Sequence, residues 1–213
     1  MKKILLKHWP IFIILIFALS VAWPIFLPGY FSHHDDLQVM RVFEMRKCIE
    51  DLQIPCRWVP DMGYGNGYPL FNYYAVFPYF LGAMASYLLG FVAATKLLFV
   101  IPILFGSFSM FLLANELFGR KAAIVASVLY TFAPFKALDI YVRGDIAESF
   151  AMATVPLIVY FALKLIRKKS VKYMISLSVS SAIFLTSHNI MTVLFSPVIF
   201  LLVIYFLQQE KWK

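Results

Sequence analysis

Apolar residues occupy most of this chain, in stretches long enough to cross a lipid bilayer. A membrane-spanning helix needs about 20 predominantly apolar residues. Six stretches reach or approach that length: 9 to 28, 95 to 115, 121 to 138, 149 to 166, 173 to 188 and 190 to 207. Polar residues gather in the segments between them. The pattern predicts an all-α integral membrane protein with about six transmembrane helices.

The composition supports this fold class and argues against soluble ones. Hydrophobic residues make up 62% of the chain and charged residues 14%, which is far too apolar for a soluble globular domain. The net charge of +8 does not indicate nucleic-acid binding, because the basic residues lie in short segments beside the apolar stretches. The partners expected are therefore membrane lipids and not nucleic acid. The oligomeric state stays open.

The distribution of basic residues predicts the topology. With a cytoplasmic N-terminus, the cytoplasmic segments hold twelve basic and two acidic residues, and the outer segments hold seven basic and nine acidic ones. Cytoplasmic loops are enriched in Lys and Arg. We therefore expect a multi-pass protein of the cell membrane with both termini cytoplasmic. A seventh apolar stretch, 76 to 92, would place Arg167, Lys168 and Lys169 outside if it crossed, so we interpret it as interfacial or re-entrant.

The first apolar stretch has two interpretations. Ser20-Val21-Ala22 fits the small-x-small pattern of a signal-peptide cleavage site. The stretch continues through Pro24 to Leu27, however, which is longer than a typical signal-peptide core. This length favours a retained first transmembrane helix.

On this topology residues 1–213 form a single membrane domain with three outer connections. The first outer loop covers 29–94, the second covers 137–148, and the third is reduced to 187–189. No internal repeat or low-complexity linker is evident. The chain is either a stand-alone protein or a fragment of a longer gene product.

The first outer loop is expected to contain a helix along the membrane interface. Residues 35 to 52 place Val42, Met45, Ile49 and Leu52 on one stripe at helical spacing. The segment that follows, 60 to 69, is dense in glycine and proline and is expected to be irregular.

Two cysteines lie in the same outer loop. Cys48 and Cys56 are separated by the expected helix end and by Pro55, and outside the cytoplasm a disulfide is permitted. A continuous helix through Cys56 would instead hold the sulfurs too far apart. A local disulfide and two free thiols are both compatible with the sequence.

Two adjacent carboxylates, Asp35 and Asp36, directly follow the first apolar stretch. Ser32 and Asp35 fit a Ser-x-x-Asp capping box, in which both side chains bind free backbone amides of a first helical turn. Capping does not need two neighbouring carboxylates, and adjacent helix residues point about 100° apart. One aspartate is therefore free to face a cavity, where a carboxylate can act as a general base.

The second outer loop carries Arg143, Asp145 and Glu148. The two acidic residues are three positions apart, on one face if helical, and a guanidinium suits phosphate recognition. The alternative is an arginine that pairs with its own acidic neighbours. Asp145 and Glu148 are also candidate ligands for a divalent metal such as Mg²⁺ or Mn²⁺, although their spacing matches no ligand motif.

Four further polar residues are candidate substrate contacts. His188 and Asn189, at the outer end of the fifth expected helix, could contact a phosphate or could be a hydrogen-bonded histidine and its neighbour. Tyr68 and Tyr73 belong to an aromatic cluster, which is typical of a membrane-interface belt and also of a wall that binds a sugar or lipid headgroup.

The order of these motifs resembles the membrane module of GT-C type glycosyltransferases. The resemblance covers most of residues 1 to 170 and rests on four features in order: an acidic motif after the first helix (His34-Asp35-Asp36), a long helical first outer loop, a cytoplasmic turn at 113 to 120, and an acidic motif before the fourth helix (Asp145-Ile146-Ala147-Glu148).

The resemblance implies a function and a set of roles. It implies transfer of a sugar from a polyprenyl-phosphate-linked donor to an acceptor at the outer face of the membrane. Asp35 or Asp36 would supply the base or position the acceptor, and Asp145 and Glu148 would help to hold a metal. The second motif here is Asp-x-x-Glu and not the Asp-x-Asp of the family, which puts metal dependence in doubt. The chain is also shorter than the family module.

The sequence of the first loop from 52 to 71 resembles that of a group of uncharacterised bacterial membrane proteins, some labelled 6-pyruvoyl-tetrahydropterin synthase-related. Pterin synthesis itself is not expected. That soluble enzyme holds zinc with three histidines, and the histidines here, His8, His33, His34 and His188, fall on both sides of the membrane.

Two other functions are compatible with the sequence. The first is a non-catalytic protein that binds a lipid-linked saccharide. The second is a transporter whose entrance the outer carboxylates would line, although transporters place charged residues near mid-membrane and often repeat their halves. The expected spans are nearly free of charge and unrepeated.

Overall fold

The structure, a computed structural model, describes the backbone of residues 2–211 and the side chains of residues 9–210. Within these residues it is almost entirely helical, with no strand and one isolated antiparallel bridge between Val59 and Tyr68. The expected all-α class is confirmed. The elements are α1 (Lys2–Ala22), η1 (Trp23–Phe26), α2 (Gln38–Glu50), α3 (Leu70–Tyr73), α4 (Phe77–Leu89), α5 (Phe91–Phe118), α6 (Arg120–Thr131), α7 (Pro134–Leu138), η2 (Asp139–Arg143), α8 (Ile146–Lys168), α9 (Val171–Ser187) and α10 (Asn189–Lys211).

Several of these helices are long and apolar enough to cross a membrane. Five such spans occur among the described residues: Trp9–Phe26, Phe91–Phe118, Arg120–Arg143, Ile146–Lys168 and Asn189–Glu210. The remaining expected span, 173 to 188, corresponds to α9, whose 17 residues reach the lower end of the length range for spanning helices. The chain is a multi-pass membrane protein.

The ambiguous stretch 76 to 92 forms the short helix α4. Its 13 residues extend about 20 Å, well short of a hydrocarbon core of about 30 Å. Gly90, with a positive φ of 75°, ends α4 and begins α5. The helix contacts α2 and α5, so it belongs to the segment that covers one end of the bundle.

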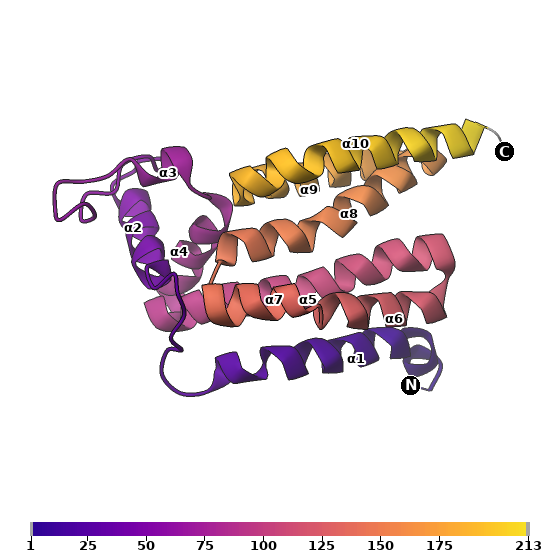
Figure 1. The fold of residues 1–213 in the computed structure, drawn as a ribbon, viewed down its shortest axis with the longest axis horizontal. Coiled ribbons are helices and arrows are strands. Elements are labelled where there is room, and N and C mark those ends of the chain that lie inside the picture. The colour runs from indigo at the N-terminus through magenta and orange to yellow at the C-terminus, as the bar shows by residue number, and fades with distance from the viewer. Residues whose placement is uncertain (1, 212–213) are drawn as a thin grey trace.

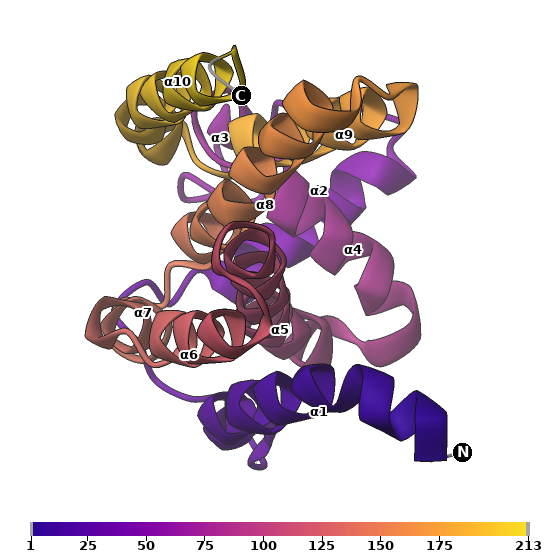
Figure 2. The same ribbon diagram turned by 90° about the vertical axis from the view of Figure 1, so that its right-hand side faces the viewer.

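The long helices run side by side, and the three short helices of the first connection gather at one end of them (Figure 1). The beginning of α1 and the end of α10 both lie at the opposite end. Figure 2 looks along the bundle and shows α5 between α6 and α8, the two helices with which it makes its most extensive contacts. The buried core follows α5 through Leu98, Phe99 and Ile103.

The expected span 121 to 138 is interrupted. Helix α6 ends at Thr131, and Ala133 is extended before Pro134 begins α7. A residue that precedes proline is pushed out of the α region, which explains the break. The chain then stays helical through α7 and a π-turn to Arg143. Only Gly144 and Asp145 separate this segment from α8, so the second connection is far shorter than the expected 137–148.

The interfacial helix is shorter than predicted, and its cap differs. Helix α2 begins after Leu37, and no side chain caps it, so the predicted capping box of Ser32 and Asp35 is wrong. Val42 and Met45 are buried as expected. Leu52 is 84% exposed and has a positive φ, because the helix ends at Glu50 and the chain turns before it can continue the stripe.

The turn after α2 brings Cys48 and Cys56 together in a disulfide, with their Cα atoms 5.4 Å apart. Cys48 lies in the last turn of the helix, and Cys56 lies in the irregular segment that follows the turn. Of the two alternatives left by the sequence, the structure has the disulfide. It ties α2 to the glycine-rich segment that follows.

Candidate functional site

The two acidic connections meet through their backbones. The amide of His34 donates to the carbonyl of Val142 at 2.8 Å, and the amide of Asp35 donates to the carbonyl of Arg143 at 2.9 Å. The Gln38 side-chain amide adds a bond of 2.7 Å to the carbonyl of Gly144. These three bonds hold the segment before α2 against the turn before α8.

An open cavity of about 460 Å³ lies at this junction. Residues from both connections line it, and most of them are charged or polar: His34, Asp35, Asp36, Leu37, Arg41, Tyr74, Arg143 and Asp145. Acidic residues of both connections, Asp35 and Asp36 from the first and Asp145 from the second, thus line one cavity. The segments that line the cavity, before α2 and before α8, lie at the end of the bundle opposite to the start of α1 and the end of α10 (Figure 1).

Asp35 is held by three donors. Arg41 approaches the Asp35 Oδ2 to 2.6 Å, the Gln38 amide to 3.0 Å and the Tyr74 hydroxyl to 3.4 Å. The guanidinium of Arg41 also lies over the Tyr74 ring, 4.4 Å from its centroid. Burial raises the pKa of Tyr74 to about 12, so its hydroxyl stays protonated and able to donate. Asp35 is therefore a fixed anchor of the cavity wall.

Asp36 differs from its neighbour. It is exposed in the same cavity, and among the described residues its carboxylate has no hydrogen bond or ion pair. Both of its oxygens are available to a ligand. Of the carboxylates that line the cavity, Asp36 is therefore the one best suited to accept a proton from a bound group.

Arg143 lies among three carboxylates. Its guanidinium is 2.9 Å from Asp139, 2.7 Å from Glu148 and 3.5 Å from Asp145. Asp139 is fully buried and also accepts a hydrogen bond of 2.8 Å from the Ser149 hydroxyl. The Arg143 side chain is 41% exposed, so part of it still faces the cavity. The predicted pairing of this arginine with its acidic neighbours is present.

Asp145 caps a helix, a role that the sequence pattern predicts for Ser32 and Asp35. Its Oδ1 accepts a hydrogen bond of 2.9 Å from the Glu148 amide at the start of α8. Burial alone would raise the pKa of Asp145, but contacts with His188, the Glu148 amide and Arg143 together hold this pKa below its ordinary value. Asp145 is therefore a structural carboxylate at a helix N-terminus.

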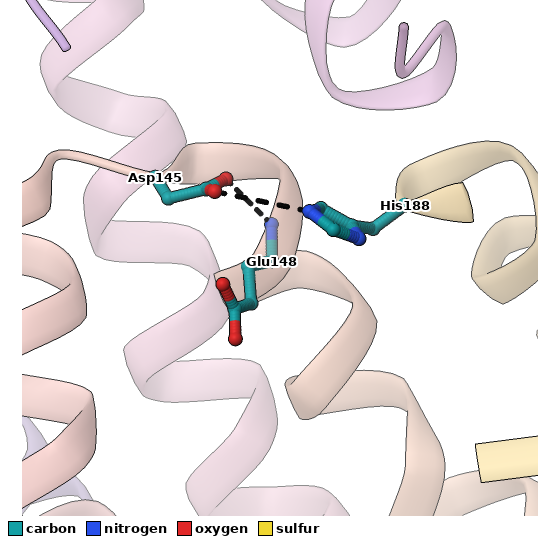
Figure 3. A group of neighbouring side chains, drawn as sticks. All are labelled: Asp145, Glu148 and His188. Atoms are coloured by element: carbon teal, nitrogen blue, oxygen red, sulfur yellow. Dashed lines mark hydrogen bonds and ion pairs between the residues drawn. The ribbon is translucent and has the colours of Figure 1, made fainter. Parts of the chain in front are cut away.

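Asp145, Glu148 and His188 form the group nearest to a metal-ligand set (Figure 3). One potential ligand atom from each lies within 4.8 Å of the others. Figure 3 shows the His188 ring directed at the Asp145 carboxylate, with 3.8 Å between Nε2 and Oδ2. The sequence predicts the two carboxylates as metal ligands and His188 as a phosphate contact, whereas in the structure His188 lies beside the carboxylates.

The partners of this group argue against a metal. His188 Nδ1 accepts a hydrogen bond of 3.1 Å from the Met191 amide, so a neutral ring carries its proton on Nε2 and donates toward Asp145. Binding a metal through Nε2 would require the proton to move to Nδ1, where the amide opposes it. Arg143 already engages both carboxylates. The residues fit an arginine-carboxylate cluster better than a metal site.

The remaining predicted contacts lie outside the cavity lining. The Asn189 side chain donates to the Tyr73 carbonyl at 2.9 Å and so joins the start of α10 to the end of α3. The side chains of Tyr73 and Tyr68 are 70% and 44% exposed. The structure thus connects Asn189 to Tyr73, the residue before the cavity-lining Tyr74, and pairs the backbone of Tyr68 with Val59. His188 contacts the cavity through Asp145.

Sequence reasoning missed three contributors to the site. Arg41 and Tyr74 hold Asp35, and Asp139 holds Arg143. Asp139 and Arg143 are four residues apart at the end of an apolar stretch, which is a signal for a helical ion pair. Tyr74 lies far from Asp35 in the chain, and no local pattern connects them.

The comparisons with known proteins place the chain in a family. The model of the 6-pyruvoyl-tetrahydropterin synthase related domain, described as a membrane protein, matches residues 71–213, which is more than half of the chain. The chain belongs to this family. The matched region includes Tyr74, Arg143 and Asp145, whereas Asp35 and Asp36 precede it. Neither the curated proteins nor the solved structures searched gave a match.

Proposed function

We propose that this protein is a membrane glycosyltransferase, or the N-terminal part of one. It would transfer a sugar from a polyprenyl-phosphate-linked donor to an acceptor hydroxyl at the outer face of the cytoplasmic membrane. The observation that carries the proposal is the state of Asp36. Its carboxylate is exposed and without a partner among the described residues, in a cavity that also contains two arginines.

Asp36 is the base in the proposed reaction. Its carboxylate takes the proton of the acceptor hydroxyl while that oxygen attacks the anomeric carbon of the sugar. A new carbon-oxygen bond forms, and the bond between the anomeric carbon and the phosphate oxygen breaks. The polyprenyl phosphate leaves with the bonding electron pair. The proton stays on Asp36 until it exchanges with water.

Arg41 and Arg143 support the leaving group. Both line the cavity, and guanidinium groups bind phosphate oxygens with charge-assisted hydrogen bonds. Each already has acidic partners, which hold the guanidinium in place before the donor arrives. Groups that are fixed in advance can stabilise developing charge without reorganising during the reaction.

The proposed topology agrees with a lipid-linked donor. The segments that line the cavity lie at the end of the bundle opposite to the start of α1 and the end of α10, and the positive-inside rule assigns that end to the outer face. A phosphate at the bilayer surface would thus reach the cavity while its prenyl chain stays in the membrane.

A non-catalytic binder is the second candidate, because Asp35, Asp145 and Glu148 are all occupied by protein donors. In this reading only the arginines and Asp36 contact the saccharide-lipid, and no bond is broken. The two candidates share a ligand and differ in turnover.

The experiment uses the full-length gene product reconstituted in liposomes with polyprenyl-phosphate mannose or glucose and an envelope extract as acceptor. Release of free polyprenyl phosphate is measured. Asp36→Asn should lower the rate by roughly 10² to 10⁴ while donor binding persists, as expected when a general base is removed. The control is Asp51→Asn, an exposed carboxylate outside the cavity, which should leave the rate unchanged. Equal rates for the wild type and Asp36→Asn would refute the assignment of the base. Donor binding without turnover in the wild type would support the binder.

A further inference from the structure

A second cavity lies at the same end of the bundle, between η1, the end of α4 and the first turns of α5. Its volume is about 320 Å³, and apolar side chains dominate its lining. Ile25 and Phe26 come from η1, Leu89 from α4, and Ala93, Leu97 and Val100 from α5. This cavity shares no lining residue with the acidic cavity.

Lys96 is the one charged residue among the described residues that line this second cavity, which is an open groove. Its Nζ donates to the carbonyl of Leu27 at 2.5 Å and to the carbonyl of Gly29 at 2.8 Å. An ammonium group has three donors, so one remains for another acceptor. The two bonds hold the amine against the segment that directly follows η1.

The charge of Lys96 is not neutralised by the protein. No carboxylate lies within ion-pair distance of its Nζ in the part of the chain whose side chains are described, and its two partners are uncharged carbonyls. Arg57 also has no acidic partner among the described residues and bonds to the Asn72 side chain at 3.5 Å, whereas four other basic residues at this end are paired. Arg41, Arg46, Lys47 and Arg143 all pair with an aspartate or a glutamate. Lys96 thus presents a fixed, uncompensated positive charge.

We propose that Lys96 and this groove bind a membrane lipid with an anionic phosphate headgroup. The lipid phosphate accepts the free N–H of Lys96, and one acyl chain lies along the apolar wall formed by Phe26, Leu89 and Leu97. Charge complementarity identifies the headgroup, because an uncompensated ammonium near the membrane surface attracts an anion and a phosphate oxygen is a strong acceptor. The exposed apolar side chains of Phe26 and Leu89 identify the rest of the ligand as hydrocarbon.

The location connects this lipid to the acidic cavity. Lys96 holds the segment that leads from η1 toward Asp35, and Phe99, one helical turn further along α5, packs against Phe31 and His33 with ring centroids 5.1 and 5.5 Å apart. A bound lipid would therefore brace the segment that carries Asp35 and Asp36. The proposal does not depend on the transfer reaction, because it concerns lipid binding alone.

The test is native mass spectrometry of the full chain in detergent, with phosphatidylglycerol as the probe and diacylglycerol as the lipid without phosphate. The wild type should bind phosphatidylglycerol in preference to diacylglycerol. Lys96→Gln keeps a donor for the two carbonyls but removes the charge, and the affinity for phosphatidylglycerol should fall by at least roughly tenfold. The matched control is Lys47→Gln, at a partly exposed lysine at the same end that pairs with Asp61, and the affinity of this variant should stay at the wild-type value.

A second variant tests the groove without altering the charge. Ala93→Trp fills the apolar wall, and phosphatidylglycerol binding should again fall although Lys96 is intact. Glycerol 3-phosphate, which has the phosphate without acyl chains, should not compete for the site at equal concentration. Unchanged phosphatidylglycerol binding in both Lys96→Gln and Ala93→Trp would overturn the proposal, as would full competition by glycerol 3-phosphate.

Discussion

The backbone amide of Asp35 donates a hydrogen bond of 2.9 Å to the carbonyl oxygen of Arg143. This bond joins the first connection of the chain to the second, and a parallel bond from His34 to Val142 repeats it one residue earlier. Backbone groups hold the two acidic segments together, so the junction does not require the carboxylate of Asp35 or Asp36. Substitutions at these side chains can therefore test chemistry while the junction persists.

Gly144 is a position at which this junction is sensitive to substitution. Its φ of 72° is in the left-handed region, and a Cβ added there would overlap the imidazole ring of His33. Gly144→Ala should lower the stability by about 1–3 kcal/mol, because it adds backbone strain and a steric clash. The measurement is the midpoint of thermal unfolding in detergent.

A double-mutant cycle separates the two causes. His33→Ala should remove the clash and leave the strain, so the cost of Gly144→Ala should be smaller in the His33→Ala background. Additive effects of the two substitutions would show that the His33 ring does not limit Gly144 and would contradict the contact.

The buried carboxyl group of Glu44 should make the stability of the protein depend on pH. Glu44 is fully buried on α2, and neither carboxylate oxygen has a hydrogen-bond partner among the described residues. Burial, with a smaller contribution from Asp61, raises its pKa above the ordinary value of 4.5. A raised pKa means that the stabilising contribution is complete below the ordinary value and is lost as the pH rises through the pKa of the folded state.

Glu44→Gln removes this titration. The variant should unfold at a higher temperature than the wild type at neutral pH, and the difference should shrink toward zero as the pH falls below 4.5. Asp51→Asn, at an exposed position just beyond the end of α2, serves as the control and should show no such trend. A difference between Glu44→Gln and the wild type that is constant with pH would exclude Glu44 as the titrating group.

Arg143 is predicted to exclude metal ions. Its guanidinium forms ion pairs with the carboxylates of Glu148 and Asp145, which are the oxygen ligands that a divalent cation would need. The wild type should therefore not retain Mn²⁺ at this cluster, whereas Arg143→Gln should bind it, measured by electron paramagnetic resonance of free Mn²⁺. The double variant with Glu148→Gln should lose the gained binding. Stoichiometric Mn²⁺ binding by the wild type that disappears in Glu148→Gln would instead establish a resident metal.

Part of the site could be predicted because its signals are local. Asp145 and Glu148 are three residues apart, and both reach Arg143 from the N-cap and the first turn of α8. The order of hydrophobic stretches also predicted the helical membrane class, which the structure confirms. Another local signal, the capping pattern, occurs twice in the sequence. Ser32 and Asp35 match a capping pattern as well as Asp145 and Glu148 do, yet only Asp145 accepts an amide at a helix start.

The sequence by itself determined that this chain lies in a membrane and that its acidic motifs occur in polar connections, because hydrophobic length and charge distribution are properties of contiguous residues. Only the tertiary structure decided which contacts each motif makes. It places Arg41 and Tyr74 on Asp35, leaves Asp36 without a partner among the described residues, and surrounds Arg143 with carboxylates that include the buried Asp139. These outcomes depend on which donors lie close to each carboxylate where two distant segments pack together. Packing between distant segments sets these distances, and no local pattern in the sequence encodes them.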